Sequence, residues 1–249
     1  MPIVSDALVL RTYKLGETSK VVVLLTRERG KLRAVAKGAR GARSRYRSAL
    51  EPLSEVRASL YGRQAAELFR LGECELLRSA FPAGARGLET ALALAYCAEL
   101  LDAFAQEGEA EDAVYRLAVA VVRAAEEGIQ GMLLARYLEA WLLRLHGLYP
   151  PLDRCAGCAA PLPGGDLAYH APAHGFVCGG CGAASGPTVP ARGRRVLEAL
   201  FRTPPGALDA SPEDAACLEA FHVTLVTRHL ERDLRSYRVL KDVARGAGA

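Results

Sequence analysis

Residues 20–56 read KVVVLLTRERGKLRAVAKGARGARSRYRSALEPLSEV, and this stretch decides the fold of the first third of the chain. An apolar run and an alternating run are separated by four residues ending in Gly30, a spacing typical of a β-hairpin. Other strand-like runs lie at 3–13, 52–61 and 66–77. Five strands without helical crossovers cannot form a parallel sheet. We therefore expect a small barrel over residues 1–80, OB-like in the first instance and SH3-like as the alternative.

Positive charge is concentrated in the same part of the chain. Between residues 11 and 47, twelve Lys or Arg stand against two acids, a net +10, whereas the whole chain carries +4 and the remainder therefore −6. This asymmetry indicates an acidic polymer or a membrane surface as partner, although a solvated face is the alternative for any charge run. Neither a basic amphipathic helix nor a lipidation motif accompanies the run, so nucleic acid is favoured.

Arginine density and one embedded aromatic residue strengthen the nucleic-acid interpretation. Arg binds phosphate bidentately, and we expect Tyr46 to offer unpaired bases a stacking surface from a mobile loop. A barrel with a basic groove is a recurrent solution for single-stranded nucleic acid. The candidate contacts are Arg27, Arg29, Lys31, Arg33, Lys37, Arg40, Arg43, Arg45, Tyr46 and Arg47.

From residue 84 the apolar residues recur at helical spacing. This pattern predicts helices over 88–104, 111–127 and 130–146, then 190–201 and 211–235, with a disordered tail from Arg245. The segment 152–190 is instead dense in Gly, Pro and Cys. The expected architecture is α+β and multidomain: the barrel at 1–80, then a helical domain at 81–249 with an inserted four-cysteine module at about 152–190.

Four cysteines in that module form the most specific motif of the chain. Cys155 and Cys158 make one C-x2-C pair, and nineteen residues later Cys178 and Cys181 make a second. Two such turns supply four thiolates in tetrahedral arrangement, which suits a structural Zn²⁺. The segment is too polar to fold by core burial, so the metal would supply folding energy. A thiol-disulfide pair, or a histidine (His170 or His174) in place of one cysteine, is the alternative.

Composition and missing motifs limit the functional classes. A chain of 249 residues that is 51% apolar and 24% charged is expected to be globular, and no run reaches the roughly twenty apolar residues of a membrane span. Seven cysteines without a secretory leader predict a reducing, cytoplasmic location. Phosphate-binding loops, nucleophile elbows and HExxH patterns are absent, so we do not expect an enzyme. The alternatives are a metal-dependent nucleic-acid enzyme and an RNA-binding or transcription-associated zinc-ribbon protein.

Residues 15–61, LGETSKVVVLLTRERGKLRAVAKGARGARSRYRSALEPLSEVRASLY, resemble the N-terminal signature of the RecO family of bacterial DNA-repair recombination mediators. The helical region followed by CAGC and CGGC resembles the C-terminal domain of that family's zinc-containing members. The resemblance implies an OB-fold that binds single- and double-stranded DNA and anneals complementary strands. It also implies partnership with RecR and with the C-terminal tail of single-stranded-DNA-binding protein, so that RecA is loaded at gaps and breaks, in the cytoplasm and associated with the nucleoid.

The resemblance also assigns roles to particular positions. It implies DNA contacts by Lys31, Arg33, Lys37, Arg40 and the arginines that follow. It places recognition of the acidic, apolar protein tail in the helical domain. Cationic residues near apolar stripes there are Arg116, Arg123, Arg136 and Arg144.

Overall fold

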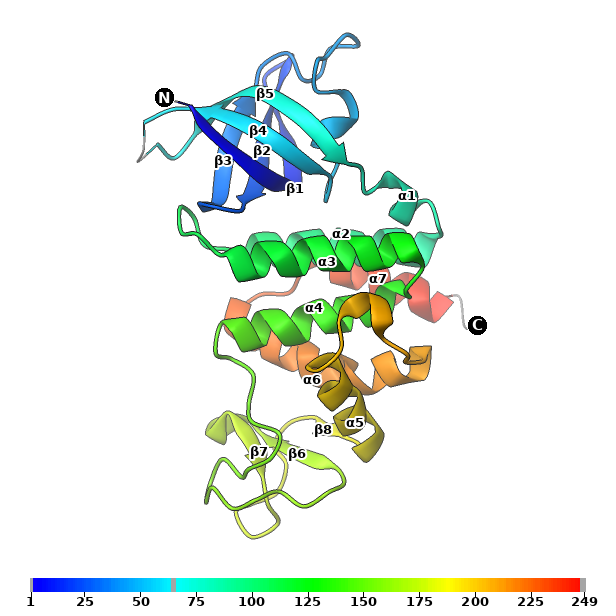
Figure 1. The fold of residues 1–249 in the computed structure, drawn as a ribbon. Helices are drawn as coiled ribbons and strands as arrows, with labels where there is room; N and C mark the ends of the chain where they lie inside the picture. The colour runs from blue at the N-terminus through cyan, green and yellow to red at the C-terminus, as the bar shows by residue number, and fades with distance from the viewer. Residues whose placement is uncertain (1, 64–65, 247–249) are drawn as a thin grey trace. The chain divides into compact units, whose positions relative to one another are not determined.

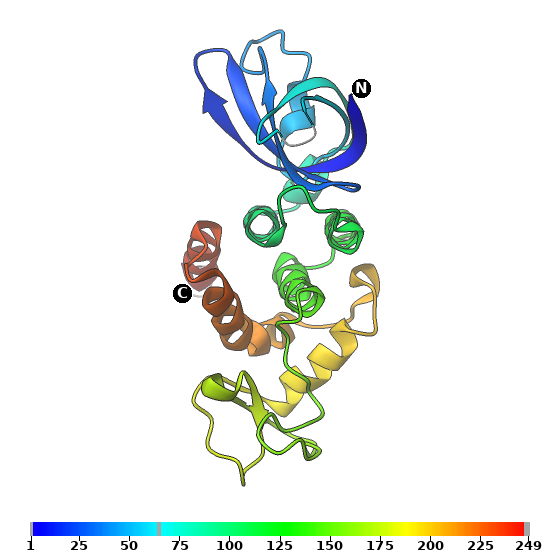
Figure 2. The same ribbon diagram turned by 90° about the vertical axis from the view of Figure 1, so that its left-hand side faces the viewer.

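The computed structural model describes residues 2–63 and 66–246. By internal packing the chain forms two compact units, one built from residues 1–131 together with 234–249, the other from residues 132–233. The domain boundary predicted at residue 80 was based on the change from strand-like to helical spacing in the sequence. The first of the two packing units instead continues past residue 80, through the first helices, to residue 131. Figures 1 and 2 show the course of the chain.

The first unit contains a closed five-stranded barrel, as expected. Its strands are β1 (Ile3–Leu15), β2 (Ser19–Thr26), β3 (Gly30–Ala36), β4 (Glu55–Tyr61) and β5 (Phe69–Arg78), in the order β1-β2-β3-β5-β4. β1 also pairs with β4, which closes the barrel, and only β3 and β5 run parallel. The inward residues form one apolar cluster that includes Val9, Leu24 and Val56. This arrangement confirms an OB-like barrel (Figure 2).

Four helices complete the first unit: α1 (Phe81–Gly84), α2 (Leu88–Phe104), α3 (Asp112–Glu127) and α7 (Arg235–Gly246). Helices α2 and α3 lie against β1, and α7 packs on α2, where the rings of Tyr96 and Tyr237 are 5.4 Å apart. The Glu99 carboxylate accepts hydrogen bonds from the backbone N–H groups of Arg235 (3.1 Å) and Ser236 (2.8 Å). A carboxylate at this position satisfies free N–H groups and favours the positive end of the α7 dipole.

The second unit combines helices with a small sheet. Apart from its first residue, α4 (Gly131–Leu145) lies here, with α5 (Ala191–Leu200) and α6 (Pro212–Leu230). The cysteine-rich segment contains β6 (Leu167–His170), β7 (Gly175–Val177) and β8 (Thr188–Val189) in the order β7-β6-β8, strands that the sequence pattern did not predict. Rings of Tyr169 and Phe176 lie 5.3 and 5.0 Å from that of Phe221 on α6. Short 3₁₀ turns occupy Ala171–Ala173 and Pro205–Ala207 in this unit, and Arg47–Leu50 in the first unit.

A buried polar network joins α4 and α6 within this unit. The Arg136 guanidinium lies 3.1 Å from the Glu139 carboxylate, whose other oxygen is 3.0 Å from Nδ1 of His222. Nε2 of His222 lies 2.9 Å from the Tyr149 hydroxyl. Arg136, Glu139 and His222 are fully buried, and this burial lowers the pKa of His222 although Glu139 opposes the shift. Neutral His222 therefore serves as a hydrogen-bonding link between the helices.

The C-terminal helical region differs from the prediction. The helix that begins with the Ser211 capping box ends at Leu230 rather than at 235, because Glu231 adopts a left-handed conformation with φ of 53°. A separate helix, α7, then includes residues 245 and 246, so the expected disorder from Arg245 is wrong for these two. Residues 247–249 lie outside the described part of the chain. Within the described ranges no helix is both long and apolar enough to cross a membrane.

Candidate nucleic-acid interface and metal site

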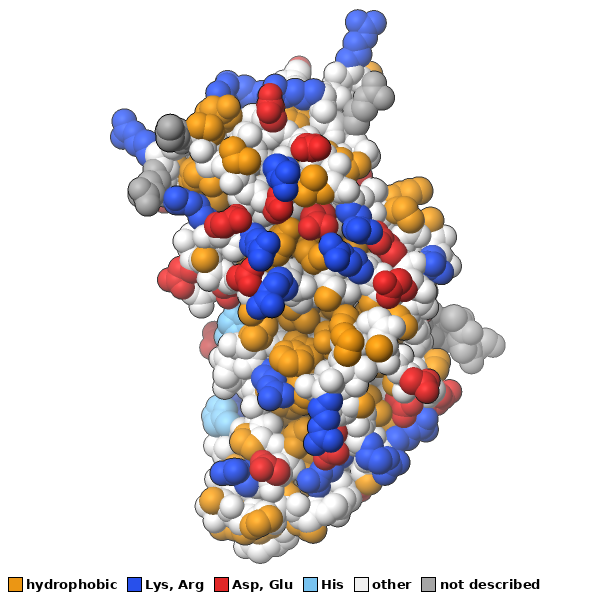
Figure 3. Space-filling view, viewed as in Figure 1, with side chains coloured by type: hydrophobic (Ala, Val, Ile, Leu, Met, Phe, Trp, Pro, Cys, Tyr) orange, Lys and Arg blue, Asp and Glu red, His pale blue; other side chains and the backbone are white. Residues whose placement is uncertain are grey.

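Acidic residues of the helical region neutralise one end of the barrel. At the β2–β3 turn, Nε of Arg27 lies 2.8 Å from Asp112, and Arg33 forms an ion pair with Glu107. Lys31 donates a 2.6 Å hydrogen bond to the backbone carbonyl of Asp102. The Arg27 guanidinium, by hydrogen bond and charge, holds the pKa of Asp112 below its usual range. Figure 3 shows basic and acidic side chains interspersed where the barrel borders the helices.

Backbone contacts hold the same turn in place. The N–H of Lys31 donates to the carbonyl of Gln106 (2.9 Å), and the N–H of Gly108 donates back to the carbonyl of Lys31 (3.2 Å). A Cβ at Gly30 would lie 1.9 Å from the carbonyl oxygen of Glu109, so only glycine permits this approach. The segment between α2 and α3 thus covers the hairpin turn. We call this neutralised region, with Arg27, Lys31 and Arg33, the paired end of the barrel.

The opposite end of β2 carries cations of a different kind. Lys14 and Lys20 face each other in the β1–β2 ladder, next to Ala36 of β3, and Lys37 follows directly. Arg40 reaches the β1–β2 turn, where its Nη1 donates to the carbonyl of Gly16 (2.7 Å). We call this set the cationic end: Lys14, Lys20, Lys37, Arg40 and, in the loop that follows Arg40, Arg43. In the described part of the chain, no carboxylate forms an ion pair with any of its members.

Tyr46 does not form the exposed stacking surface that the sequence suggested. Its side chain is only 2% exposed, belongs to the barrel core, and donates a 3.0 Å hydrogen bond to the carbonyl of Leu71. The Arg45 guanidinium lies 4.9 Å from the ring centroid and donates to the hydroxyl. The prediction is wrong for Tyr46 because its ring fills the barrel interior and is not available to a base. Arg45 is held against that ring.

The remaining two predicted DNA contacts, Arg29 and Arg47, are not part of the cationic end. Arg29 lies in the β2–β3 turn at the paired end, and no ion pair to it occurs among the described residues. The side chain of Arg47 lies outside the described part of the structure. Sequence reasoning omitted Lys14 and Lys20, although their place at the ends of a predicted hairpin could have indicated them. The DNA contacts stay a prediction. Of the predicted residues we retain Lys37, Arg40 and Arg43 as the main candidates, and we add Lys14 and Lys20.

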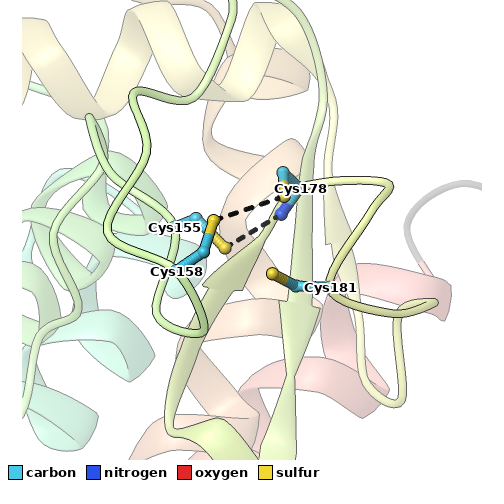
Figure 4. Close-up of side chains that lie close together, drawn as sticks. All are labelled: Cys155, Cys158, Cys178 and Cys181. Carbon is cyan, nitrogen blue, oxygen red and sulfur yellow. Dashed lines mark hydrogen bonds between the residues drawn. The ribbon is translucent and has the colours of Figure 1, made fainter.

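The four predicted cysteines come together in the second unit (Figure 4). Their Sγ atoms all lie within 4.8 Å of one another, and those of Cys158 and Cys178 are 3.8 Å apart. Backbone N–H groups of Gly157 and Cys178 point at the Cys155 sulfur, at 3.4 and 3.3 Å. This set could hold a metal ion. Neither His170 nor His174 belongs to it, so the alternative with a histidine ligand is not supported.

The electrostatics of the cluster favour a cation. Hydrogen bonds from the backbone, foremost that of Cys178, lower the pKa of Cys155 to about 6. The neighbouring thiols, first that of Cys158, raise the pKa of Cys181 to about 12. Four sulfurs so close together cannot all ionise without a compensating positive charge, because like charges disfavour one another. A divalent ion that displaced the thiol protons would supply this charge.

The fold and these two sites define a class: an OB-fold protein with a helical region and a tetracysteine cluster that could hold a metal ion. Comparison with known proteins is more specific. The family model described as Recombination protein O N terminal matches residues 1–80, and that described as Recombination protein O C terminal matches residues 86–238. The chain belongs to the RecO family of DNA repair proteins.

Individual relatives agree over nearly the full length. The chain is 35% identical over 240 residues to the DNA repair protein RecO of Koribacter versatilis, covering 95% of this chain and 97% of the relative. It is 38% identical over 243 residues to the protein of the same name from Desulforudis audaxviator, with 95% of each chain covered. The corresponding protein of Anaeromyxobacter sp. is 34% identical over 248 residues, with 97% of this chain and 96% of the relative covered.

Proposed function

We propose that this chain is a recombination mediator that binds and anneals DNA single strands and helps to load the recombinase at gaps and breaks, without covalent catalysis. Membership of a DNA repair family supports this function. The observation that carries it is the cationic end of the OB-like barrel, where five Lys or Arg side chains have no acidic partner among the described residues. Such cations can neutralise phosphates without first breaking an ion pair within the protein.

Salt dependence of DNA binding tests which end of the barrel is used. Replacing Lys37 and Arg43 by Gln removes two phosphate contacts, so the slope of log K against log salt becomes shallower by about 0.7 to 0.9 per contact. The matched control replaces Arg27 and Arg33 by Gln, two cations that are already neutralised by Asp112 and Glu107. An unchanged slope in the first variant, or an equal change in both, would remove the cationic end from the interface.

Annealing and partnership are parts of the same proposal. The partners are single- and double-stranded DNA, RecR and the C-terminal tail of single-stranded-DNA-binding protein. The experiment measures annealing of complementary strands coated with that protein, with and without RecR. Annealing that depends on this chain supports the mediator function; strands that pair no faster than with the coating protein alone contradict it. A cytoplasmic, nucleoid-associated location follows from such a role.

Arg144 is the best placed of the four helical-region cations to receive an acidic tail. Arg136 is fully buried, Arg116 is paired with Asp112, and Arg123 lies 4.0 Å from the Glu55 carboxylate. The Arg144 guanidinium instead lies 4.5 Å from the ring centroid of Phe201, at a pocket of about 290 Å³ that Tyr149 and Pro150 also line. The pocket combines apolar side chains with this cation, and Asp153 also lines it. Apolar surface next to a positive charge suits a peptide that combines apolar and acidic groups. We therefore expect Arg144→Glu to weaken binding of the tail peptide while DNA affinity stays unchanged.

We propose that the metal is zinc and that it is structural. A tetrahedral ZnS₄ site with bonds of about 2.3 Å has sulfur–sulfur distances of about 3.8 Å. The separation of the Cys158 and Cys178 sulfurs, 3.8 Å, fits this geometry. When bound, zinc supplies folding energy to the module rather than a reactive centre, since four thiolates leave no open position. Elemental analysis of protein purified without added metal should give one zinc per chain; a content near zero would refute the assignment.

A further inference from the structure

One row of paired residues crosses the outer face of all five strands. Tyr13 of β1 pairs with Val21 of β2, and Val21 pairs with Val35 of β3. Val35 pairs with Arg70 of β5, and Arg70 with Tyr61 of β4. Residues that are partners across a ladder point to the same face of the sheet. The five side chains, from Tyr13 to Tyr61, therefore form a continuous strip, which we call the Tyr13–Tyr61 row.

Exposure shows that this row faces outward. Tyr13 is 44% and Tyr61 40% exposed, which is unusual for large rings on a barrel. The adjacent row points inward, because its members Val22, Ala34 and Phe69 belong to the barrel core. Val21 is buried and Val35 half-buried. The exposed members of the row are thus Tyr13, Arg70 and Tyr61, with the short side chains of Val21 and Val35 between Tyr13 and Arg70.

The ring of Tyr61 lies next to Gly72 and Arg70 of the neighbouring strand. A Cβ at Gly72 of the neighbouring strand would lie 2.4 Å from Cε2 of Tyr61, so the ring rests on bare backbone. The Arg70 guanidinium lies 4.9 Å from the ring centroid. A planar guanidinium over an aromatic ring is itself a surface on which a base can stack. At the other end of the row, the Arg11 guanidinium lies 5.8 Å from the centroid of Tyr13.

The row borders the cationic end. Lys14 follows Tyr13 directly, and Lys37 lies two residues beyond Val35, directly after the end of β3. Four steps between neighbouring strands of about 4.8 Å give the row a length of about 19 Å along the curved face. This is room for a few unstacked bases, while the phosphates of the same strand follow the lysines. Proteins that bind single-stranded nucleic acids combine aromatic rings, on which bases stack, with cations that contact the phosphates.

We propose that Tyr13 and Tyr61 are the base-stacking surfaces of the barrel, so that its ligand is an unpaired strand with its bases along the Tyr13–Tyr61 row. This inference rests on the proposed function, since it assumes that the barrel binds DNA. It replaces the buried Tyr46 by two exposed rings that the charge pattern did not indicate. It also separates two kinds of contact, phosphates at the cationic end and bases on the row.

An abasic oligonucleotide isolates the base contacts, because it has the phosphates and sugars of a normal single strand but no bases. The full-length protein should bind the normal strand more tightly than the abasic strand of equal length. Tyr61→Leu should reduce this ratio by a factor of about 5 to about 150, the usual effect of losing one stacking ring. Tyr61→Phe should keep it. Lys37→Gln, the matched control, should weaken both ligands equally and leave the ratio unchanged.

Two further variants keep the proposal testable if Tyr61→Leu fails to fold. Tyr13→Leu removes the ring at the other end and should lower the same ratio. Gly72→Ala displaces the Tyr61 ring without deleting it and should act in the same direction. Its control is Gly41→Ala, because a Cβ there has only one ordinary contact, 3.6 Å from the carbonyl of Gly38.

The outcomes separate the two proposals. If the wild-type protein binds neither oligonucleotide, the proposed DNA binding fails. If it binds both equally, or if the folded Tyr61 and Tyr13 variants keep the wild-type ratio, DNA binding stands and the stacking assignment is overturned.

Discussion

At the scale of single residues, Tyr46 is a structural side chain whose hydroxyl has a measurable role. The hydroxyl donates to the carbonyl of Leu71 inside the barrel. Tyr46→Phe should lower the free energy of unfolding by about 1 kcal/mol, because one buried hydrogen bond is lost. Affinity for single-stranded DNA should not change. Urea unfolding and a DNA titration on the same preparation check both statements; lost affinity at unchanged stability would return Tyr46 to the interface.

Residue types and local spacing predicted the four-cysteine cluster but not the two tyrosines proposed to stack on bases. The two C-x2-C motifs determine their own geometry, since each pair lies on one tight turn, and the four sulfurs meet as expected. By contrast, Tyr46 is recognisable as a core residue only once Leu71 lies beside it. Tyr13 and Tyr61 become one feature only through four strand pairings. Such nonlocal contacts have no local sequence signal.

At the scale of elements, the β2–β3 hairpin was predicted, whereas its neutralisation was not. Lys31 meets Asp102 and Arg33 meets Glu107 across more than seventy residues. The number of cations free to bind phosphate is therefore smaller than the count of Lys and Arg in the sequence suggested. The break between α6 and α7 was missed for a related reason. Residues 231–234 contain neither Gly nor Pro, Glu231 adopts a conformation uncommon for its type, and the cap of α7 is the distant Glu99.

The link between α4 and α6 should make stability depend on pH. In the folded chain, burial lowers the pKa of His222 below its ordinary value of 6.5. The unfolded chain therefore binds a proton at a higher pH than the folded chain does, so stability is complete above about pH 6.5 and falls as the pH drops through that value. Burial and the charge of Arg136 favour the neutral imidazole and outweigh the opposing effect of Glu139, while the Tyr149 hydroxyl contacts Nε2.

Chemical denaturation at several pH values measures this effect. The slope for wild type should reach at most about 1.4 kcal/mol per pH unit below pH 6.5. His222→Gln keeps hydrogen-bonding capacity without a titrating group, and its stability should vary less over the same interval. Identical slopes for the two proteins would show that His222 is not the group responsible.

At the scale of the whole molecule, the cysteine cluster and the proposed DNA-binding barrel belong to different units. The four cysteines lie in residues 132–233, whereas the barrel belongs to the other unit. A chelator should therefore lower the thermal midpoint of unfolding and leave DNA affinity below that midpoint unchanged. Cys178→Ser should act like the chelator, and Cys217→Ser, a cysteine outside the cluster, should not. A parallel loss of DNA affinity on chelation would contradict this separation.

The return of the chain to its first unit has a consequence for biosynthesis. Helix α7 packs on α2, and Ser236 donates to Glu99 across 137 positions of sequence. Translation proceeds at about 5 to 20 residues per second, so α2 waits about 7 to 27 seconds on the ribosome for this partner. During that interval the α2 face that α7 will cover stays open to other chains and to chaperones. A message truncated before codon 235 would yield a protein with its metal module and barrel, yet with this face permanently uncovered.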